Sequence, residues 1–177
     1  MSLERRLFVG LFPPSEVARL VHDAARKVLS EKDFRIVPAD EIHLTLRFFG
    51  ATPEPAIPGI AASLEAALRA SRRPALRIRG AGAFPDADSA RVLWAGIEEA
   101  GDRLARLAVS VGEVKPFHPH LTVARCRNAR APEAFLDLSI DLPWTPSEVL
   151  LVESRPGTAG PERFPRIEAF PISPESP

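Results

Sequence analysis

The sequence predicts an α+β domain whose sheets are antiparallel or mixed. Short extended segments alternate with amphipathic helical segments along the 177 residues. Some predicted strands follow one another directly, as around residues 79 and 91, with a turn-rich Pro-Asp-Ala-Asp-Ser segment between them. Strands this close can pair as neighbours, whereas a doubly wound parallel sheet needs a helix between successive strands. No Ser/Gly-rich linker divides the chain, so we expect one domain over residues 1–177.

The individual elements follow from apolar runs and their periodicity. A short apolar strand at 7–12 stops at two prolines, and a helix follows from Ser15, a candidate N-cap, to Val28, with apolar residues at helical spacing. Strict alternation of apolar residues predicts a half-buried strand at 42–49. The other expected elements are helices at 54–70 and 102–111 and strands at 34–37, 76–79, 91–97, 120–124, 149–152 and 166–170.

Composition and charge narrow the class of protein. The formal net charge is zero, so no global field draws the chain to nucleic acid, and any RNA contact must come from a local patch. Cys126 is the only cysteine, which excludes an intrachain disulfide and suits a reducing compartment. No apolar run is long enough for a signal peptide or a membrane span. We therefore expect a cytoplasmic protein that is monomeric and has no membrane partner.

The most informative feature is a repeated motif, His-Leu-Thr followed by an aliphatic residue. It occurs at 43–46 and again at 120–123, and it contains two of the four histidines. Each copy lies in a strand-like segment, where residues i and i+2 point to the same face about 7 Å apart. Each histidine therefore shares a face with the threonine that follows it, while the leucine between them points into the core.

Two such pairs facing one groove are suited to acid–base chemistry on a phosphate. Imidazole titrates near neutral pH, so one of His43 and His120 can accept a proton while the other donates one. The hydroxyls of Thr45 and Thr122 can donate hydrogen bonds to phosphate oxygens and hold the phosphorus between the imidazoles. A lone His-Leu-Thr is more typical of a buried structural histidine, but the repeat favours a site. The sequence leaves open which histidine is the base.

An arginine follows each motif at a different spacing. Arg47 lies four residues after His43, on the same face of a regular strand, and Phe49 continues that face. Arg125 lies five residues after His120, so it points away unless a bulge or the end of the strand turns it inward. We predict that Arg47, Phe49 and Arg125 contact the substrate.

The sequence resembles the 2H phosphoesterases, a superfamily named for two H-x-T/S-x motifs. Within it, the chain is most similar to the bacterial and archaeal RNA 2′,3′-cyclic phosphodiesterases, also called 2′-5′ RNA ligases of the LigT or ThpR type. The matching segments are RLFVGLFPP at 6–14, EIHLTLRFFG at 41–50, GAFPDADSARVLWAGIE at 82–98, KPFHPHLTVAR at 115–125 and LLVESRPGTAGPERFPRIEAFPI at 150–172. The resemblance covers nearly the whole chain.

This resemblance implies a bilobal, pseudo-twofold fold, with two mainly antiparallel sheets flanking a central cleft and helices outside. It places His43 and His120 at the catalytic positions, Thr45 and Thr122 beside them, and Arg125 at a phosphate-binding position. The implied activity is hydrolysis of RNA 2′,3′-cyclic phosphate ends to a 2′-phosphate, with 2′-5′ ligation as its reverse, and with neither cofactor nor metal. The chain also departs from the family pattern in three places: Phe48 and Phe49 stand for the usual Phe-Leu before glycine, the segment before the second motif is shorter than in relatives, and the 164–165 Phe-Pro pair stands where relatives often carry a tyrosine.

Three alternatives remain open at this point. A short segment before Lys115 favours a phosphodiesterase for small cyclic-phosphate or 2′-5′-linked nucleotides, because it alters the rim of the cleft. A non-catalytic RNA-end binder is less well supported, since binding alone needs no titrating pair. A zinc site built from His43, His118 and His120 lacks the further local ligands that such sites usually have.

Overall fold

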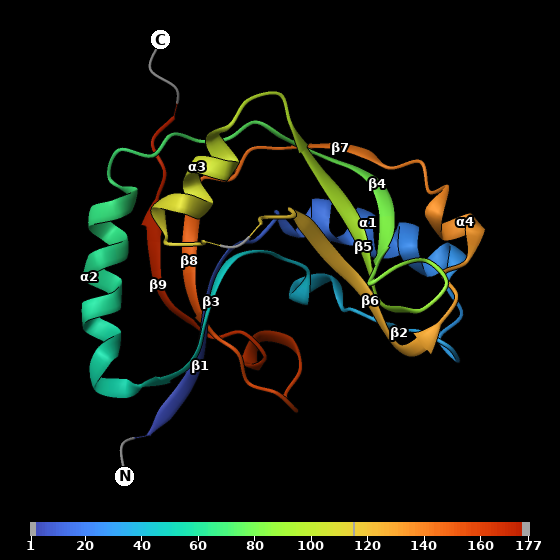
Figure 1. The fold of residues 1–177 in the computed structure, drawn as a ribbon, viewed down its shortest axis with the longest axis horizontal. Helices are drawn as coiled ribbons and strands as arrows, with labels where there is room; N and C mark the ends of the chain where they lie inside the picture. Colours follow the sequence, from blue (N-terminus) through green and yellow to red (C-terminus); the bar gives the residue numbers. More distant parts are fainter. Residues whose placement is uncertain (1–2, 115, 175–177) are drawn as a thin grey trace.

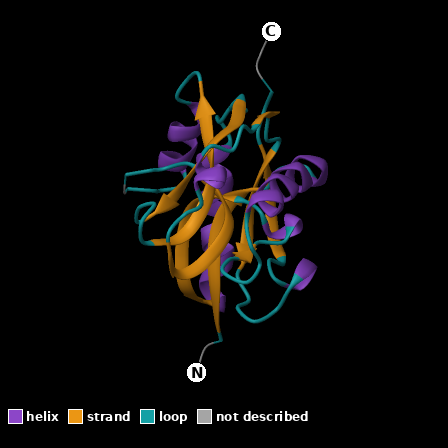
Figure 2. Cartoon of the chain, turned by 90° about the vertical axis from the view of Figure 1, so that its right-hand side faces the viewer, coloured by secondary structure: helices purple, strands orange, loops and turns teal. Residues whose placement is uncertain are grey.

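The computed structural model describes residues 3–114 and 116–174, so Lys115 lies outside the described part of the chain. Its strands form two sheets in which every strand pair is antiparallel (Figures 1 and 2). The first sheet has the order β3-β1-β8-β9, with β1 at Glu4–Leu11, β3 at Leu44–Pro53, β8 at Glu148–Glu153 and β9 at Arg166–Pro171. The second has the order β2-β6-β5-β4-β7, with β2 at Arg35–Ile36, β4 at Leu76–Phe84, β5 at Ala90–Glu99, β6 at His120–Ala129 and β7 at Asp141–Trp144.

The helices cover the outer faces of the two sheets. Helices α2 (Ile57–Leu68) and α3 (Arg103–Ser110) pack on the first sheet, through β9 and β3 respectively. Helix α1 (Ser15–Val28) packs on β6 of the second sheet, next to the short α4 (Glu133–Leu136) (Figure 1). Three 3₁₀ turns complete the structure: η1 (Ala39–Glu41), η2 (Glu54–Ala56) and η3 (Gly160–Glu162). The predicted α+β architecture of two antiparallel sheets with outer helices is confirmed.

The chain crosses repeatedly between the sheets, so neither sheet is built from one continuous stretch of sequence. Strands β1 and β3 belong to the first sheet, whereas β2, which lies between them in sequence, belongs to the second. One cluster of buried apolar side chains includes residues from both sheets, among them Val9 and Leu44 from the first and Leu93 and Leu121 from the second. Leu44 and Leu121 are the leucines of the two motifs, and both are buried as predicted. This shared core favours our interpretation of the chain as one domain.

The structure differs from the predicted elements at the start of α1 and in the additional strand β7. Ser15 is the first residue of α1, and Pro14 occupies the cap position with no side-chain cap bond, so the prediction of Ser15 as N-cap is wrong. Proline fixes φ near its helix-entry value, and here it takes over that position. Strand β7 was not predicted because it contains Pro143. Proline is tolerated there because β7 is an edge strand, paired only with β4.

No helix in the described part of the chain is both long and apolar enough to cross a membrane.

Candidate active site

One cleft between the two sheets contains both motifs. Its volume is about 440 Å³, and its lining includes His43 and Thr45 from the β3 side and His120, Thr122 and Arg125 from β6. Strands β3 and β6 are in contact, although they belong to different sheets. The structure thus brings these five predicted site residues together in one cleft.

The two histidines are held by the same local hydrogen bond. Nδ1 of His43 lies 2.7 Å from the carbonyl oxygen of Glu41, and Nδ1 of His120 lies 2.7 Å from the carbonyl oxygen of His118. Because a carbonyl only accepts, Nδ1 carries the proton in each neutral ring, and Nε2 keeps its lone pair. Each imidazole can therefore use Nε2 either as a proton acceptor or, once protonated, as a donor.

A bulge in β6 turns Arg125 into the cleft. Along β5, Trp94 pairs with Thr122 and Leu93 pairs with Ala124, so the register shifts between these two pairs. The extra residue in β6 lies between Thr122 and Ala124. Because of it, Arg125, which pairs with Val92, points to the same side of the sheet as Thr122. This is the inward turn that the sequence required for Arg125 to contact substrate.

A bulge at the matching place in β3 has the opposite effect on Arg47. Gly10 of β1 pairs with Thr45, and its neighbour Val9 pairs with Arg47, so Thr45 and Arg47 point to opposite faces. Arg47 donates a hydrogen bond of 2.7 Å to the carbonyl oxygen of Val111, at the end of α3. The structure therefore does not bring Arg47 and Phe49, the other two predicted substrate contacts, to the cleft, because neither lines it.

Arg47 and Phe49 instead join β3 to the helices outside the sheet. The Arg47 guanidinium lies 4.5 Å from the centre of the Phe49 ring, and both line a separate pocket between α2 and α3. Gly112 follows α3 with φ of 84°, and a side chain there would overlap the Arg47 guanidinium. These contacts hold α3 against β3, which is a structural role.

Aromatic rings enclose His43. Its ring stacks on Phe8 and Phe12, at centroid distances of 4.8 and 5.0 Å, and Phe164 makes an edge contact at 4.8 Å. Burial lowers the pKa of His43 to about 4; the hydrogen bond to Glu41 opposes this shift, and the nearby Arg125 adds to it. His43 in this environment is therefore neutral at physiological pH. Phe164 contributes an apolar wall beside the ring.

His120 lies against a different group of rings. Phe84 makes an edge contact at 5.0 Å, and Trp94 and His118 lie at 6.4 and 6.3 Å. Trp94 can occupy its place only because residue 82 is glycine, since any Cβ there would overlap the indole. Burial is again the largest cause of a lowered pKa for His120, and the charges of His118 and Arg125 lower it further.

Arg163 is a cleft residue that the sequence reasoning missed. It lies in the loop before β9, its Nε is 3.9 Å from a carboxylate oxygen of Glu41, and its guanidinium lies 4.8 Å from the centre of the Phe164 ring. Its Nη1 is buried without a hydrogen-bond partner among the described residues. A buried guanidinium nitrogen with no partner is costly, and an anion in the cleft would satisfy it. Arg163 was not predicted as a site residue because it lies in a loop, where strand periodicity gives no signal, and is far in sequence from both motifs.

The cleft therefore combines an acid–base pair with concentrated positive charge. The pKa of Arg125 is lowered by burial first, and then by the nearby charges of Arg35 and Arg163. Such a group of guanidinium and imidazole side chains is suited to a phosphate anion. Over residues 3–114 and 116–174, no three His, Cys, Asp or Glu side chains are grouped so as to hold a metal ion.

Comparisons with known proteins agree with this description. The family model of the 2′-5′ RNA ligase superfamily matches residues 12–158. An RNA 2′,3′-cyclic phosphodiesterase of Thermus thermophilus is 35% identical over 176 residues, which cover 88% of this chain and 85% of the relative. A protein of the same name from Aquifex aeolicus is 28% identical over 138 residues, covering 70% and 71% of the two chains.

Solved structures share the fold. A crystal structure of a Thermus thermophilus protein aligns with a TM-score of 0.80 and 30% identity, over 97% of this chain and 100% of the other. Escherichia coli LigT, crystallised with 3′-AMP, aligns with a TM-score of 0.78 over 97% and 99% of the two chains. At 22% identity, this second likeness concerns the fold alone.

Proposed function

This chain belongs to the 2′-5′ RNA ligase superfamily, and on that premise we infer that it is an enzyme that opens the 2′,3′-cyclic phosphate at RNA ends. The curated relatives that match most of its length are named RNA 2′,3′-cyclic phosphodiesterases. The observation that carries the proposal is the matched pair of histidines. His43 and His120 line one cleft, and each is held through Nδ1 with Nε2 left available for proton transfer.

The reaction needs one neutral and one protonated imidazole. One Nε2 takes a proton from water as the water oxygen attacks phosphorus, and the bond from phosphorus to the 3′ oxygen breaks in line with that attack. The other imidazole gives its proton to the departing 3′ oxygen, which leaves a 3′-hydroxyl and a 2′-phosphate. With a 5′-hydroxyl in place of water, the same pair can take the proton of that hydroxyl as its oxygen attacks phosphorus and protonate the departing 3′ oxygen, which is 2′-5′ ligation.

We assign binding of the phosphate to the arginine and threonine side chains of the cleft. Arg125 and Arg163 supply hydrogen-bond donors to the non-bridging oxygens, and Thr45 and Thr122 supply hydroxyls. Burial is the largest cause of the lowered pKa of both histidines and neighbouring positive charges add to it, so a bound anion offsets the part that is due to those charges. Substrate binding thus favours protonation of an imidazole.

Product analysis tests this function directly. An RNA that ends in a 2′,3′-cyclic phosphate should gain one water, and ³¹P NMR should show a 2′-phosphomonoester. The rate should be the same with and without EDTA, because imidazoles rather than a metal-bound hydroxide move the protons. Loss of activity in EDTA that zinc or manganese restores would contradict the two-histidine mechanism.

A further inference from the structure

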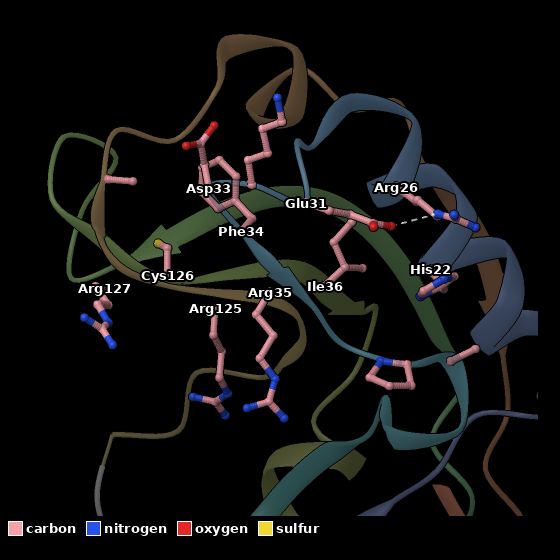
Figure 3. A pocket seen from close by; sticks show the side chains of 14 residues that line it. His22, Arg26, Glu31, Asp33, Phe34, Arg35, Ile36, Arg125, Cys126 and Arg127 are labelled. Atoms are coloured by element: carbon pink, nitrogen blue, oxygen red, sulfur yellow. Dashed lines mark hydrogen bonds and ion pairs between the residues drawn. The ribbon is translucent and has the colours of Figure 1, made fainter. Parts of the chain in front are cut away.

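A second, larger cavity adjoins the cleft. Its volume is about 1200 Å³, and it lies between the C-terminal part of α1, β2 and the far end of β6 (Figure 3). It shares Arg35, Pro38 and Arg125 with the cleft, so the two spaces lie on either side of these residues. Small-ligand sites generally have volumes of about 300–1,000 Å³, and the cleft alone falls within that range. The second cavity is therefore space beyond what one small ligand requires.

A row of arginines runs from the cleft into this cavity. Arg35 of β2 pairs directly with Arg125 of β6, and Arg127 lies two residues further along β6 and lines the same cavity. In Figure 3 the Arg35 and Arg125 side chains lie together and extend the same way, and Arg127 extends in a similar direction further along β6, whereas Cys126 points elsewhere. No carboxylate of the described residues pairs with any of the three.

Repulsion within this row of arginines destabilises the folded protein. Like charges placed directly opposite on neighbouring strands are destabilising, as Arg35 and Arg125 are here. The acidic side chains of the cavity do not relieve this repulsion. Glu31 pairs instead with Arg26 at 3.2 Å, and the Asp33 carboxylate extends away from the row (Figure 3). A ligand with several negative charges would relieve it.

We propose that this cavity is a groove for the nucleotides that precede the cyclic-phosphate end of an RNA strand, with Arg127 and Arg35 binding their internucleotide phosphates. This rests on the proposed function, since the terminal phosphate must lie between His43 and His120. A strand leaving the cleft along the arginine row would meet a cation at successive positions. A small cyclic-phosphate nucleotide would fill the cleft and leave Arg127 without a ligand, so the groove favours an oligonucleotide substrate.

The experiment compares two substrates that carry the same terminal nucleotide. One is a nucleoside 2′,3′-cyclic monophosphate, and the other is a short oligonucleotide with that cyclic phosphate at its end. The variant is Arg127→Gln, because Arg127 lines the groove and not the cleft, whereas Arg35 lines both. The matched control is Arg69→Gln, which removes an exposed arginine just after α2, at the opposite end of the molecule (Figure 1).

We expect Arg127→Gln to lower kcat/KM for the oligonucleotide about tenfold, within the range of a charged hydrogen bond, and to leave the mononucleotide within about twofold. The slope of log(kcat/KM) against log[salt] for the oligonucleotide should become shallower by about 0.7, the value for one single-strand phosphate contact. Arg127→Lys should keep that slope, and Arg69→Gln should change neither substrate.

Equal losses on both substrates would overturn the proposal, as would a wild-type enzyme that shows the same kcat/KM for both. Fluorescence anisotropy measures binding in the groove without a reaction when the labelled oligonucleotide has unmodified 2′ and 3′ hydroxyls. Binding weakened by Arg127→Gln and not by Arg69→Gln supports the groove, and equal binding by all three proteins overturns it. Absence of turnover on both substrates with this binding intact would reject the proposed function and leave the groove in place.

Discussion

Strands β3 and β6 carry the same motif and the same irregularity, yet they supply different surfaces to the cleft. Each has a bulge directly after its threonine, at Leu46 in β3 and at Val123 in β6. Three residues after the threonine, β6 places Arg125 in the cleft, and the equivalent position of β3 places Phe48 there. The Phe48 side chain is 70% exposed, whereas the arginine that precedes it points to the helices outside.

This comparison indicates that each motif supplies one histidine for proton transfer, whereas the two sides of the cleft supply different groups for binding the substrate. The β6 side supplies the guanidinium of Arg125 and the route to the arginine row. The β3 side supplies an apolar environment, in which His43 lies among the rings of Phe8, Phe12 and Phe164. A strand bulge is enough to produce this difference, because it decides which face each following residue takes.

The largest expected effect tests whether the two histidines are equivalent. His43→Ala and His120→Ala should each lower kcat on a cyclic-phosphate substrate by on the order of 10²–10⁴. Because both act in one transition state, the double variant should lose less than the product of the two single losses. Steady-state kinetics measure this, and circular dichroism of each variant checks that it is folded. Full activity in either single variant would leave the motifs as structural strands.

The pH dependence of stability should separate the two histidines. The pKa of His43 is lowered to about 4 in the folded protein, so the unfolded chain binds more protons between about pH 6.5 and 4. The His43 contribution to stability is therefore complete above that window and is lost as the pH falls through it, by at most about 3 kcal/mol.

Thermal unfolding at several pH values measures this difference. His43→Gln should show a smaller fall in Tm from pH 7 to pH 4.5 than the wild type does. His120→Gln should reduce the fall less, because His120 lies at a more open part of the cleft. Identical pH profiles for the wild type and His43→Gln would contradict the enclosed, neutral state of His43.

The two arginines that follow the motifs should behave oppositely. Arg125→Gln should lower kcat/KM by roughly 10- to 100-fold, the usual range for a charged hydrogen bond, with little change in Tm. Arg47→Gln should leave kcat/KM within about twofold and lower the free energy of unfolding by about 1 kcal/mol, because its bond to Val111 is lost. Kinetics and denaturant unfolding of both variants measure this. The reverse pattern would mean that Arg47, and not Arg125, contacts the substrate.

The smallest effect concerns the threonines. Thr45→Val and Thr122→Val should each lower kcat/KM by about tenfold or less, since they orient the phosphate without transferring protons. The two losses should be similar, because both hydroxyls lie at the same step of equivalent strands. A loss confined to one threonine, measured on the mononucleotide substrate, would show that the division between the strands extends to the hydroxyls.

Much of the fold was predictable because apolar periodicity is a local property. The buried leucines of the motifs, the boundaries of α1 and the alternation in β3 follow directly from it. Edge strand β7 escaped prediction because Pro143 argues against a strand unless its neighbours are known. The loop residue Arg163 escaped for a similar reason, since its place in the cleft depends on how the segment before β9 folds back.

The sequence alone indicated acid–base chemistry on a phosphate, because this inference depends only on the residue types of the two histidine–threonine pairs and on their spacing in a strand. It predicted the inward turn of Arg125 only as a condition. The tertiary structure decided which side chains around the motifs face the phosphate, because pairing with β1 and β5 sets the bulges that turned Arg125 inward and Arg47 outward. It also decided the low pKa of His43 and the arginine row, since both arise from segments that are distant in sequence and meet only in the folded chain.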